Sequence, residues 1–211
     1  MSAMCESTHK MCWKLSRIGI PFDPRLIPLN GIYVLFEKGE DAHGGDRIVR
    51  IGTHTGLDNL PSRLQEHFLV ENKDRSIFRK NIGRALLNRD SDPFLAQWEV
   101  DLTSSKSKAT NGCKIDVRKK DETEKRVTKY IRDQFSFVVI LSARGKSDRL
   151  ELEERLIATI SLCMICKPSS SWLGLHSPVE KIRRSGMWNV QGLWKETGVS
   201  KDDLKKLQSL G

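Results

Sequence analysis

The stretch Gly31-Ile-Tyr-Val-Leu-Phe36 decides the fold, because it is short, apolar and rich in β-branched and aromatic residues. Such a composition predicts a β-strand. A second stretch of this kind, Arg47-Ile-Val-Arg-Ile-Gly52, follows a polar loop with three glycines at 38–46. Two strands joined by a short glycine-rich loop predict an antiparallel hairpin. Alternation along the first strand places Tyr33 and its two chain neighbours on opposite faces.

The other elements follow from apolar spacing and from the positions of proline and glycine. Phe135-Ser-Phe-Val-Val-Ile-Leu141 is the clearest buried strand, and residues 94–100 predict another. Residues 1–30 contain three prolines, which favours an extended lead-in, and the Ser, Lys and Thr residues of 103–112 indicate a loop. Helices are predicted at 61–69, 77–87, 118–134, 150–166 and 178–184 and at the C-terminal end. The tryptophans of the last 40 residues indicate packing rather than base stacking.

The composition limits the class of protein. A chain of 211 residues with 38% hydrophobic residues fits one decorated domain and is too apolar to be disordered throughout. The net charge of +9 favours a polyanionic partner such as a nucleic acid. No apolar run approaches the roughly 20 residues of a membrane-spanning helix. The first 14 residues lack the apolar segment of a secretory signal, so we expect a cytoplasmic protein.

The five cysteines are odd in number and widely scattered, which argues against a disulfide framework. Cys163 and Cys166 have a two-residue spacing that suits metal ligands, but zinc normally takes four ligands. No second pair of Cys or His has the usual spacing. The two thiols lie in an apolar run, so core packing is favoured over a metal or redox role.

The helix at 150–166 opens with three glutamates, which fall on different faces. Glu153 shares a face with Ile157 on the apolar side, whereas Glu151 faces Arg155 and Glu154 lies on a more polar side. We therefore expect Glu151 and Glu154 to point away from any site that contains Glu153. A carboxylate on an apolar stripe is unfavourable unless a metal ion or a cationic partner compensates it. The helix dipole, which favours acids near an N-terminus, is the alternative explanation.

Arg63 and His67 are four residues apart and therefore project from the same face of the predicted helix. A guanidinium binds phosphate oxygens in a bidentate manner, and an imidazole transfers protons near neutral pH. On spacing alone, an ordinary solvent-facing pair is the favoured explanation. A strand tyrosine such as Tyr33 is usually a packing residue, but it acts as a general base if its proton is drawn off.

Taken in order, these residues resemble the GIY-YIG nuclease superfamily. Gly31-Ile32-Tyr33 matches the first signature tripeptide, and Arg50-Ile51-Gly52 matches the second except at its first position. Arg63 and His67 then stand on the following helix, and Glu153 stands on a helix after the third strand. The agreement of order, spacing and local structure is more specific than either tripeptide.

The resemblance implies an α/β fold of the α+β kind, with a small three-stranded antiparallel sheet flanked by helices. It places an N-terminal extension at 1–29 and the nuclease core at 30–168, with a helical or loop insertion at about 84–134. A helical C-terminal extension at 169–211 packs on this core.

The implied activity is the hydrolysis of DNA phosphodiester bonds with a divalent ion, Mg²⁺ or Mn²⁺. Glu153 would hold the ion, and Tyr33 would take a proton from the attacking nucleophile. Arg63 would neutralise charge on the phosphate. His67 would orient Tyr33, share its proton or hold the phosphate. DNA is therefore the expected partner; no membrane association is expected, and no pattern indicates an oligomeric state.

Three further positions, Arg50, Thr53 and His54, are predicted to contact the substrate. Arg50 stands in place of the second signature tyrosine and could bind phosphate or favour a deprotonated Tyr33. Thr53 replaces a lysine that many members carry. Many members also place an asparagine after the glutamate helix, and the corresponding position here is Ser171.

Two classes of function remain open on the sequence. The leading interpretation is an endonuclease of restriction or repair type, because Tyr33, Arg63, His67 and Glu153 are all present. The alternative is a nucleic-acid-binding module of the same fold with weakened catalysis, which the departures at Arg50 and Ser171 favour. Plasmid nicking with and without Mg²⁺ separates the two.

Overall fold

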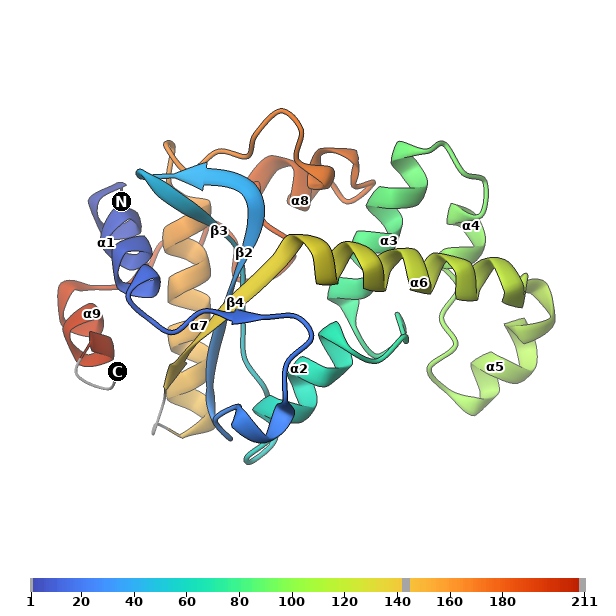
Figure 1. Ribbon diagram of the computed structural model, residues 1–211, viewed down its shortest axis with the longest axis horizontal. Coiled ribbons are helices and arrows are strands. Elements are labelled where there is room, and N and C mark those ends of the chain that lie inside the picture. The colour runs from blue at the N-terminus through green and yellow to red at the C-terminus, as the bar shows by residue number, and fades with distance from the viewer. Residues whose placement is uncertain (1, 142–144, 209–211) are drawn as a thin grey trace.

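The computed structural model describes residues 2–141 and 145–208. The described part contains a four-stranded antiparallel sheet in the order β1-β4-β2-β3 (Figure 1). Its strands are β1 (Ile18–Gly19), β2 (Gly31–Ala42), β3 (Gly45–Gly52) and β4 (Phe135–Leu141). The α/β class and the three predicted strands are confirmed, but the expected number of three strands is wrong. The added strand β1 is two residues long and therefore carries no periodicity that a sequence reading could detect.

Helices cover both faces of the sheet. On one face lie α1 (Ser2–Trp13), α7 (Lys146–Ser161) and α9 (Lys201–Gln208), which share one hydrophobic cluster with Ile32 and Val34 of β2. On the other face lie α2 (Leu60–Phe68), α3 (Ile77–Arg89) and α6 (Val117–Gln134), which pack against Tyr33 and Leu35. The predicted alternation around Tyr33 is therefore confirmed. The described residues also form short 3₁₀ helices, namely η1 (Pro24–Leu26), η2 (Gly112–Lys114) and η3 (Leu173–His176).

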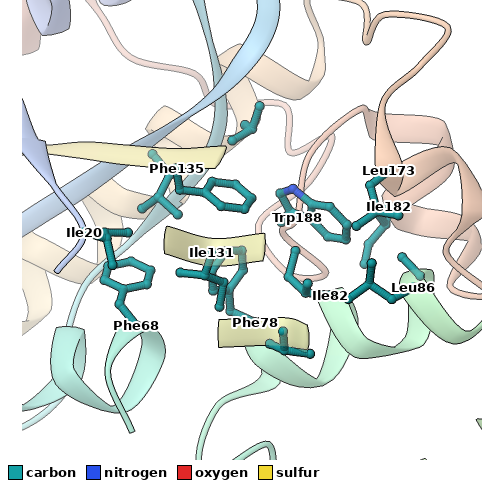
Figure 2. Packing of buried hydrophobic residues seen from close by; sticks show 14 of the residues in the cluster. Ile20, Phe68, Phe78, Ile82, Leu86, Ile131, Phe135, Leu173, Ile182 and Trp188 are labelled. Atoms are coloured by element: carbon teal, nitrogen blue, oxygen red, sulfur yellow. The ribbon is translucent and has the colours of Figure 1, made fainter. Parts of the chain in front are cut away.

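The C-terminal segment packs against the second of these faces. Figure 2 shows Trp188 beside Phe135, with Ile182 of α8 (Glu180–Ser185) above α3. The ring of Phe78 on α3 lies edge-on to Phe135 and to Trp188, with centroid separations of 5.3 and 6.4 Å. Trp188 is fully buried, as is nearly all of Trp172, which agrees with the packing role predicted for these tryptophans.

One buried carboxylate joins the C-terminal segment and α6 to the sheet. Glu37 of β2 is 3% exposed. Its Oε2 atom accepts the indole N–H groups of Trp172 at 2.7 Å and Trp188 at 2.9 Å, and its Oε1 atom accepts the hydroxyl of Tyr130. A single side chain thus provides the acceptors for three donors from two separate parts of the chain.

Two segments predicted to lack helix are helical. Residues 2–13 form α1, since the prolines begin only at Pro21 and since Cys5, Thr8, His9 and Cys12 are spaced to form one buried stripe. The Ser, Lys and Thr residues of 103–112 include α5 (Ser105–Asn111), where the hydroxyl of Ser104 caps the helix by accepting the Ser107 N–H at 3.0 Å.

Two strand-related predictions are also wrong in detail. Residues 94–100 hold α4 (Leu95–Trp98) rather than a strand, and the backbone N–H of Phe94 is held by Asp92. The predicted loop at 38–46 is mostly strand. The turn itself consists of His43 and Gly44, whose φ angles of 58° and 88° are the positive values of a tight hairpin turn.

We searched the described residues for a helix that is long and apolar enough to span a bilayer, and none meets that requirement.

The bonds of Glu37 generate a prediction about stability. In Glu37→Ala, three donors lose their acceptor, and each unsatisfied buried donor costs about 1–3 kcal/mol, so we expect the free energy of unfolding to fall by at least about 3 kcal/mol. Glu37→Gln is the matched control. Its amide oxygen can still accept both indole N–H groups, and its amide nitrogen can donate to Tyr130, so the expected loss is below about 1.5 kcal/mol. Urea unfolding at one pH measures both, and equal losses would contradict the assignment.

Candidate active site

A pocket of about 490 Å³ lies where the open edge of the sheet meets α2, α7 and the C-terminal segment. Three of the four predicted catalytic residues line it: Tyr33 from β2, Arg63 from α2 and Glu153 from α7. Two predicted substrate contacts, Arg50 and Thr53, line it as well. The rest of the lining comes from Thr55, Ile77, Leu150, Glu154, Ile157, Asn189, Val190, Gln191 and Gly192.

The phenol of Tyr33 has room in the sheet because the residue opposite it is a glycine, which has no side chain. It pairs with Gly52 of β3 in the antiparallel register. A Cβ atom at Gly52 would lie 2.2 Å from the Tyr33 hydroxyl oxygen, which is far closer than atoms can approach. Gly52, the glycine of the second tripeptide, therefore makes room for the phenol.

Glu153 is held at the same end of β3. The backbone N–H of Thr53 donates to its Oε1 atom at 3.2 Å. One helical turn earlier, Arg149 donates from Nε to the Thr53 hydroxyl at 3.1 Å and from Nη2 to the His54 carbonyl at 3.2 Å. These bonds fix α7 against residues 53 and 54. Because Gly52 touches Tyr33 and Thr53 bonds Glu153, the two side chains face the same short stretch of backbone.

Burial raises the pKa of Glu153 above its ordinary value, although Arg50, the Thr53 N–H and Arg63 act in the opposite direction. A carboxylate in this environment gains from a further cation.

Arg50 occupies the position of the second signature tyrosine and is 7% exposed. Its Nη1 atom donates to the carbonyl of Trp188 at 3.0 Å, and its guanidinium lies 5.1 Å from the ring centroid of Phe78. The other arginine of the pocket, Arg63, is half-buried and donates to Glu66 at 3.0 Å and to the Arg75 carbonyl at 3.1 Å. Two cations thus line the same pocket as Tyr33.

His67 does not line the pocket but lies directly behind it. The side chain is fully buried, and its ring centroid is 5.8 Å from that of Tyr33. Its Nδ1 atom is 2.6 Å from the Ser76 hydroxyl, whereas Nε2 has no hydrogen-bond partner among the described residues. Burial lowers the pKa of His67 well below 6.5, and Arg50, Arg63 and Arg79 lower it further. The imidazole is therefore neutral at physiological pH and is inaccessible to a phosphate in the pocket.

The other residues considered in the sequence analysis lie at different positions relative to the pocket. His54 is 1% exposed, its ring bonds the Gly56 carbonyl at 2.8 Å, and it does not line the pocket. Glu151 is exposed and faces Arg155 at 3.8 Å, as predicted. Glu154 was predicted to point elsewhere, but it is an exposed residue of the pocket rim, so that prediction is wrong. Ser171 lies beside Ser169, outside the pocket.

Asn189 is the pocket residue that sequence reasoning missed. Its side-chain amide forms two hydrogen bonds with the backbone of Ile51, accepting the N–H at 3.1 Å and donating to the carbonyl at 2.8 Å. The amide thereby satisfies the open edge of β3 as a neighbouring strand would. The only signal in the sequence is a polar residue next to a buried tryptophan, because Asn189 lies 138 residues from Ile51.

The fold and the pocket together define a class of protein: a small antiparallel sheet flanked by helices, in which a strand tyrosine, a helix arginine and a helix glutamate line one polar pocket, as in GIY-YIG nucleases. The sequence model of the GIY-YIG domain matches residues 23–210. The chain therefore belongs to the GIY-YIG domain family, which generally comprises endonucleases that use divalent metal ions. No curated protein and no solved structure matches the chain.

The buried imidazole generates a prediction about pH. The folded protein keeps His67 neutral as the pH falls, whereas the unfolded chain takes up a proton near pH 6.5. The resulting stability is complete above about pH 6.5 and is lost as the pH falls toward the lower folded-state pKa. In His67→Asn this contribution is absent. We expect the stability difference between wild type and variant to shrink between about pH 7.5 and about pH 5.

Urea unfolding across this range measures that difference. The buried His54 is present in both proteins, so its own titration cancels. A difference that does not change with pH would show that His67 is not held neutral by its surroundings.

Proposed function

We propose that this chain is an endonuclease that hydrolyses DNA phosphodiester bonds with the help of a divalent ion, Mg²⁺ or Mn²⁺. The observation that carries the proposal is that Tyr33, Arg63 and Glu153, from three separate elements, line one pocket. Residues 30–168 would form the catalytic core, with the insertion at about 84–134 and the extensions around it. A restriction or a repair role would follow from what the insertion recognises.

The donor set of the pocket suits a hard cation. Mg²⁺ prefers oxygen ligands, keeps several waters and needs only one or two protein carboxylates. Glu153 provides a carboxylate whose pKa is raised by burial, and neither cysteine nor histidine is among the residues that line the pocket. We assign Glu153 as the residue that would hold the ion, with Glu154 on the rim. The ion, when bound, would polarise the phosphate and stabilise the leaving oxygen.

The protein's own groups would act on the nucleophile and the phosphate. As the phenolate, after its own hydroxyl proton has passed to solvent, Tyr33 would take the proton of the attacking water, directly or through a second water. Arg63 would bind a non-bridging phosphate oxygen, and Arg50 would add positive charge on the same wall. His67 lies against the Tyr33 ring and is buried. Of the roles that the resemblance allows, its burial therefore supports orienting Tyr33 over holding phosphate.

Glu153→Gln tests the proposal, since it keeps the side-chain shape and removes the charge. Plasmid nicking at saturating Mg²⁺ should fall by orders of magnitude, while DNA binding persists. Glu151→Gln is the matched control, because Glu151 is an exposed glutamate on the same helix and does not line the pocket. Its nicking rate should equal that of wild type. If Glu153→Gln nicked DNA at the wild-type rate, the proposal would fail, and if wild type did not nick DNA, the binding-module alternative would hold.

The insertion is the part of the chain proposed to bind the DNA backbone. Residues 104–134 hold ten basic and five acidic residues, an excess of five, and Lys106 and Lys108 of α5 are exposed. In Lys106→Ala/Lys108→Ala, each lost phosphate contact should lower the log–log salt slope of duplex binding by about 0.9. The control is Lys201→Ala/Lys205→Ala on α9, at the opposite end of the molecule (Figure 1). Equal slopes for the two variants would place the DNA elsewhere.

A further inference from the structure

Four metal-ligating side chains meet at the end of the β2–β3 hairpin that is farthest from the candidate active site. Cys5 and His9 come from α1, His43 from the hairpin turn, and Cys166 from the segment that follows α7. Their candidate ligand atoms all lie within 4.8 Å of one another. Figure 1 shows α1 lying beside this turn and beside α7. None of these residues lines the candidate active site.

The separations suit a single tetrahedral ion. With Zn–S bonds of about 2.3 Å and Zn–N bonds of about 2.0–2.1 Å, the sulfur and nitrogen ligands of a tetrahedral site are about 3.6 Å apart. The Cys5 Sγ atom is 3.3 Å from His43 Nε2, and the Cys166 Sγ atom is 3.7 Å from His9 Nε2. The thiols are free, so no disulfide competes for the sulfur atoms.

The surroundings of His9 are those of a metal ligand. Its Nδ1 atom lies 2.9 Å from the Cys5 carbonyl, so that the Nδ1–H donates to the backbone and Nε2, which is 3.7 Å from the Cys166 Sγ atom, keeps its lone pair. Metal-bound histidines commonly donate their second ring N–H in this way. The backbone N–H of Ile48 donates to Nε2 at 3.1 Å, and an ion at this atom would replace that hydrogen bond.

The donor set selects the kind of metal. Two thiolates with two imidazoles suit zinc, whereas magnesium requires oxygen ligands, and no carboxylate belongs to this group. Three of the four residues are buried and His43 is half-buried, so that four protein ligands close the site, as in structural rather than catalytic zinc centres.

We propose that Cys5, His9, His43 and Cys166 bind one zinc ion, which fastens α1 to the hairpin turn and to the chain after α7. The proposal does not rest on the nuclease activity, because the two sites share no residue. The ion would hold together three segments that are far apart in the sequence.

The first test is the metal content of the full-length wild-type protein, produced in zinc-supplemented medium and measured by inductively coupled plasma mass spectrometry. One zinc ion per chain is expected, and replacement by Co²⁺ should give the absorption of tetrahedral thiolate coordination. These measurements do not depend on any variant folding. A wild-type protein that binds neither Zn²⁺ nor Co²⁺ would overturn the proposal.

Variants then locate the ion. Cys166→Ser and His9→Gln should weaken zinc binding by more than the roughly 10- to 100-fold that changes next to a metal ligand cause. Cys12→Ser is the matched control, because Cys12 is a fully buried cysteine on the same helix but is not part of the group. It should keep one zinc ion, as should Glu153→Gln. Wild-type zinc affinity in Cys166→Ser and His9→Gln would place the ion elsewhere and overturn the assignment.

Discussion

The arrangement of the C-terminal half of this protein depends on one buried carboxylate. Glu37 lies in the middle of β2, where burial raises its pKa above the ordinary value. The side chain remains there because Trp172, Trp188 and Tyr130 all donate to it. A buried carboxylate with satisfied oxygens fixes its donors in direction as well as in distance, which apolar packing does not do. The indoles of Trp172 and Trp188 therefore have fixed orientations, which also fix the course of the C-terminal segment that carries them.

That path leads to the candidate active site. The backbone N–H of Trp188 donates to the Val49 carbonyl at 2.8 Å, and the next residue, Asn189, pairs with Ile51 through its side chain. The carbonyl of Trp188 in turn accepts the guanidinium of Arg50. The open edge of β3 is thus completed by a segment that lies far away in the sequence. Without this segment, Arg50 would have no fixed direction, and the pocket would lack one wall.

Structural features that depend on local sequence patterns can be predicted from the sequence. Strands around Tyr33 and Ile51 are visible because β-branched residues repeat in short runs. Arg63 is assigned to the site through the order of motifs that resembles the GIY-YIG family, because its helical spacing alone favours an ordinary solvent-facing pair. Contacts between distant segments leave no such pattern, so β1 and Asn189 were missed. The helix α1 was missed because prolines that follow it suggested an extended segment. Once α1 is helical, Cys5 and His9 fall on one face at i,i+4, whereas in an extended segment they would not be brought together.

The two proposed metal sites offer different ligand atoms, so that each would select a different kind of metal ion. The pocket presents carboxylate oxygens, which hold hard cations loosely and leave coordination positions to water and phosphate. The cluster around Cys166 presents sulfur and nitrogen from four protein side chains, three of them buried, so it would favour zinc and leave no coordination position for substrate. They lie at opposite ends of the same hairpin, whose strands pair from Tyr33–Gly52 to Ala42–Gly45. An ion that fastens the turn restrains the register of both strands, and the contact of Tyr33 with Gly52 depends on that register.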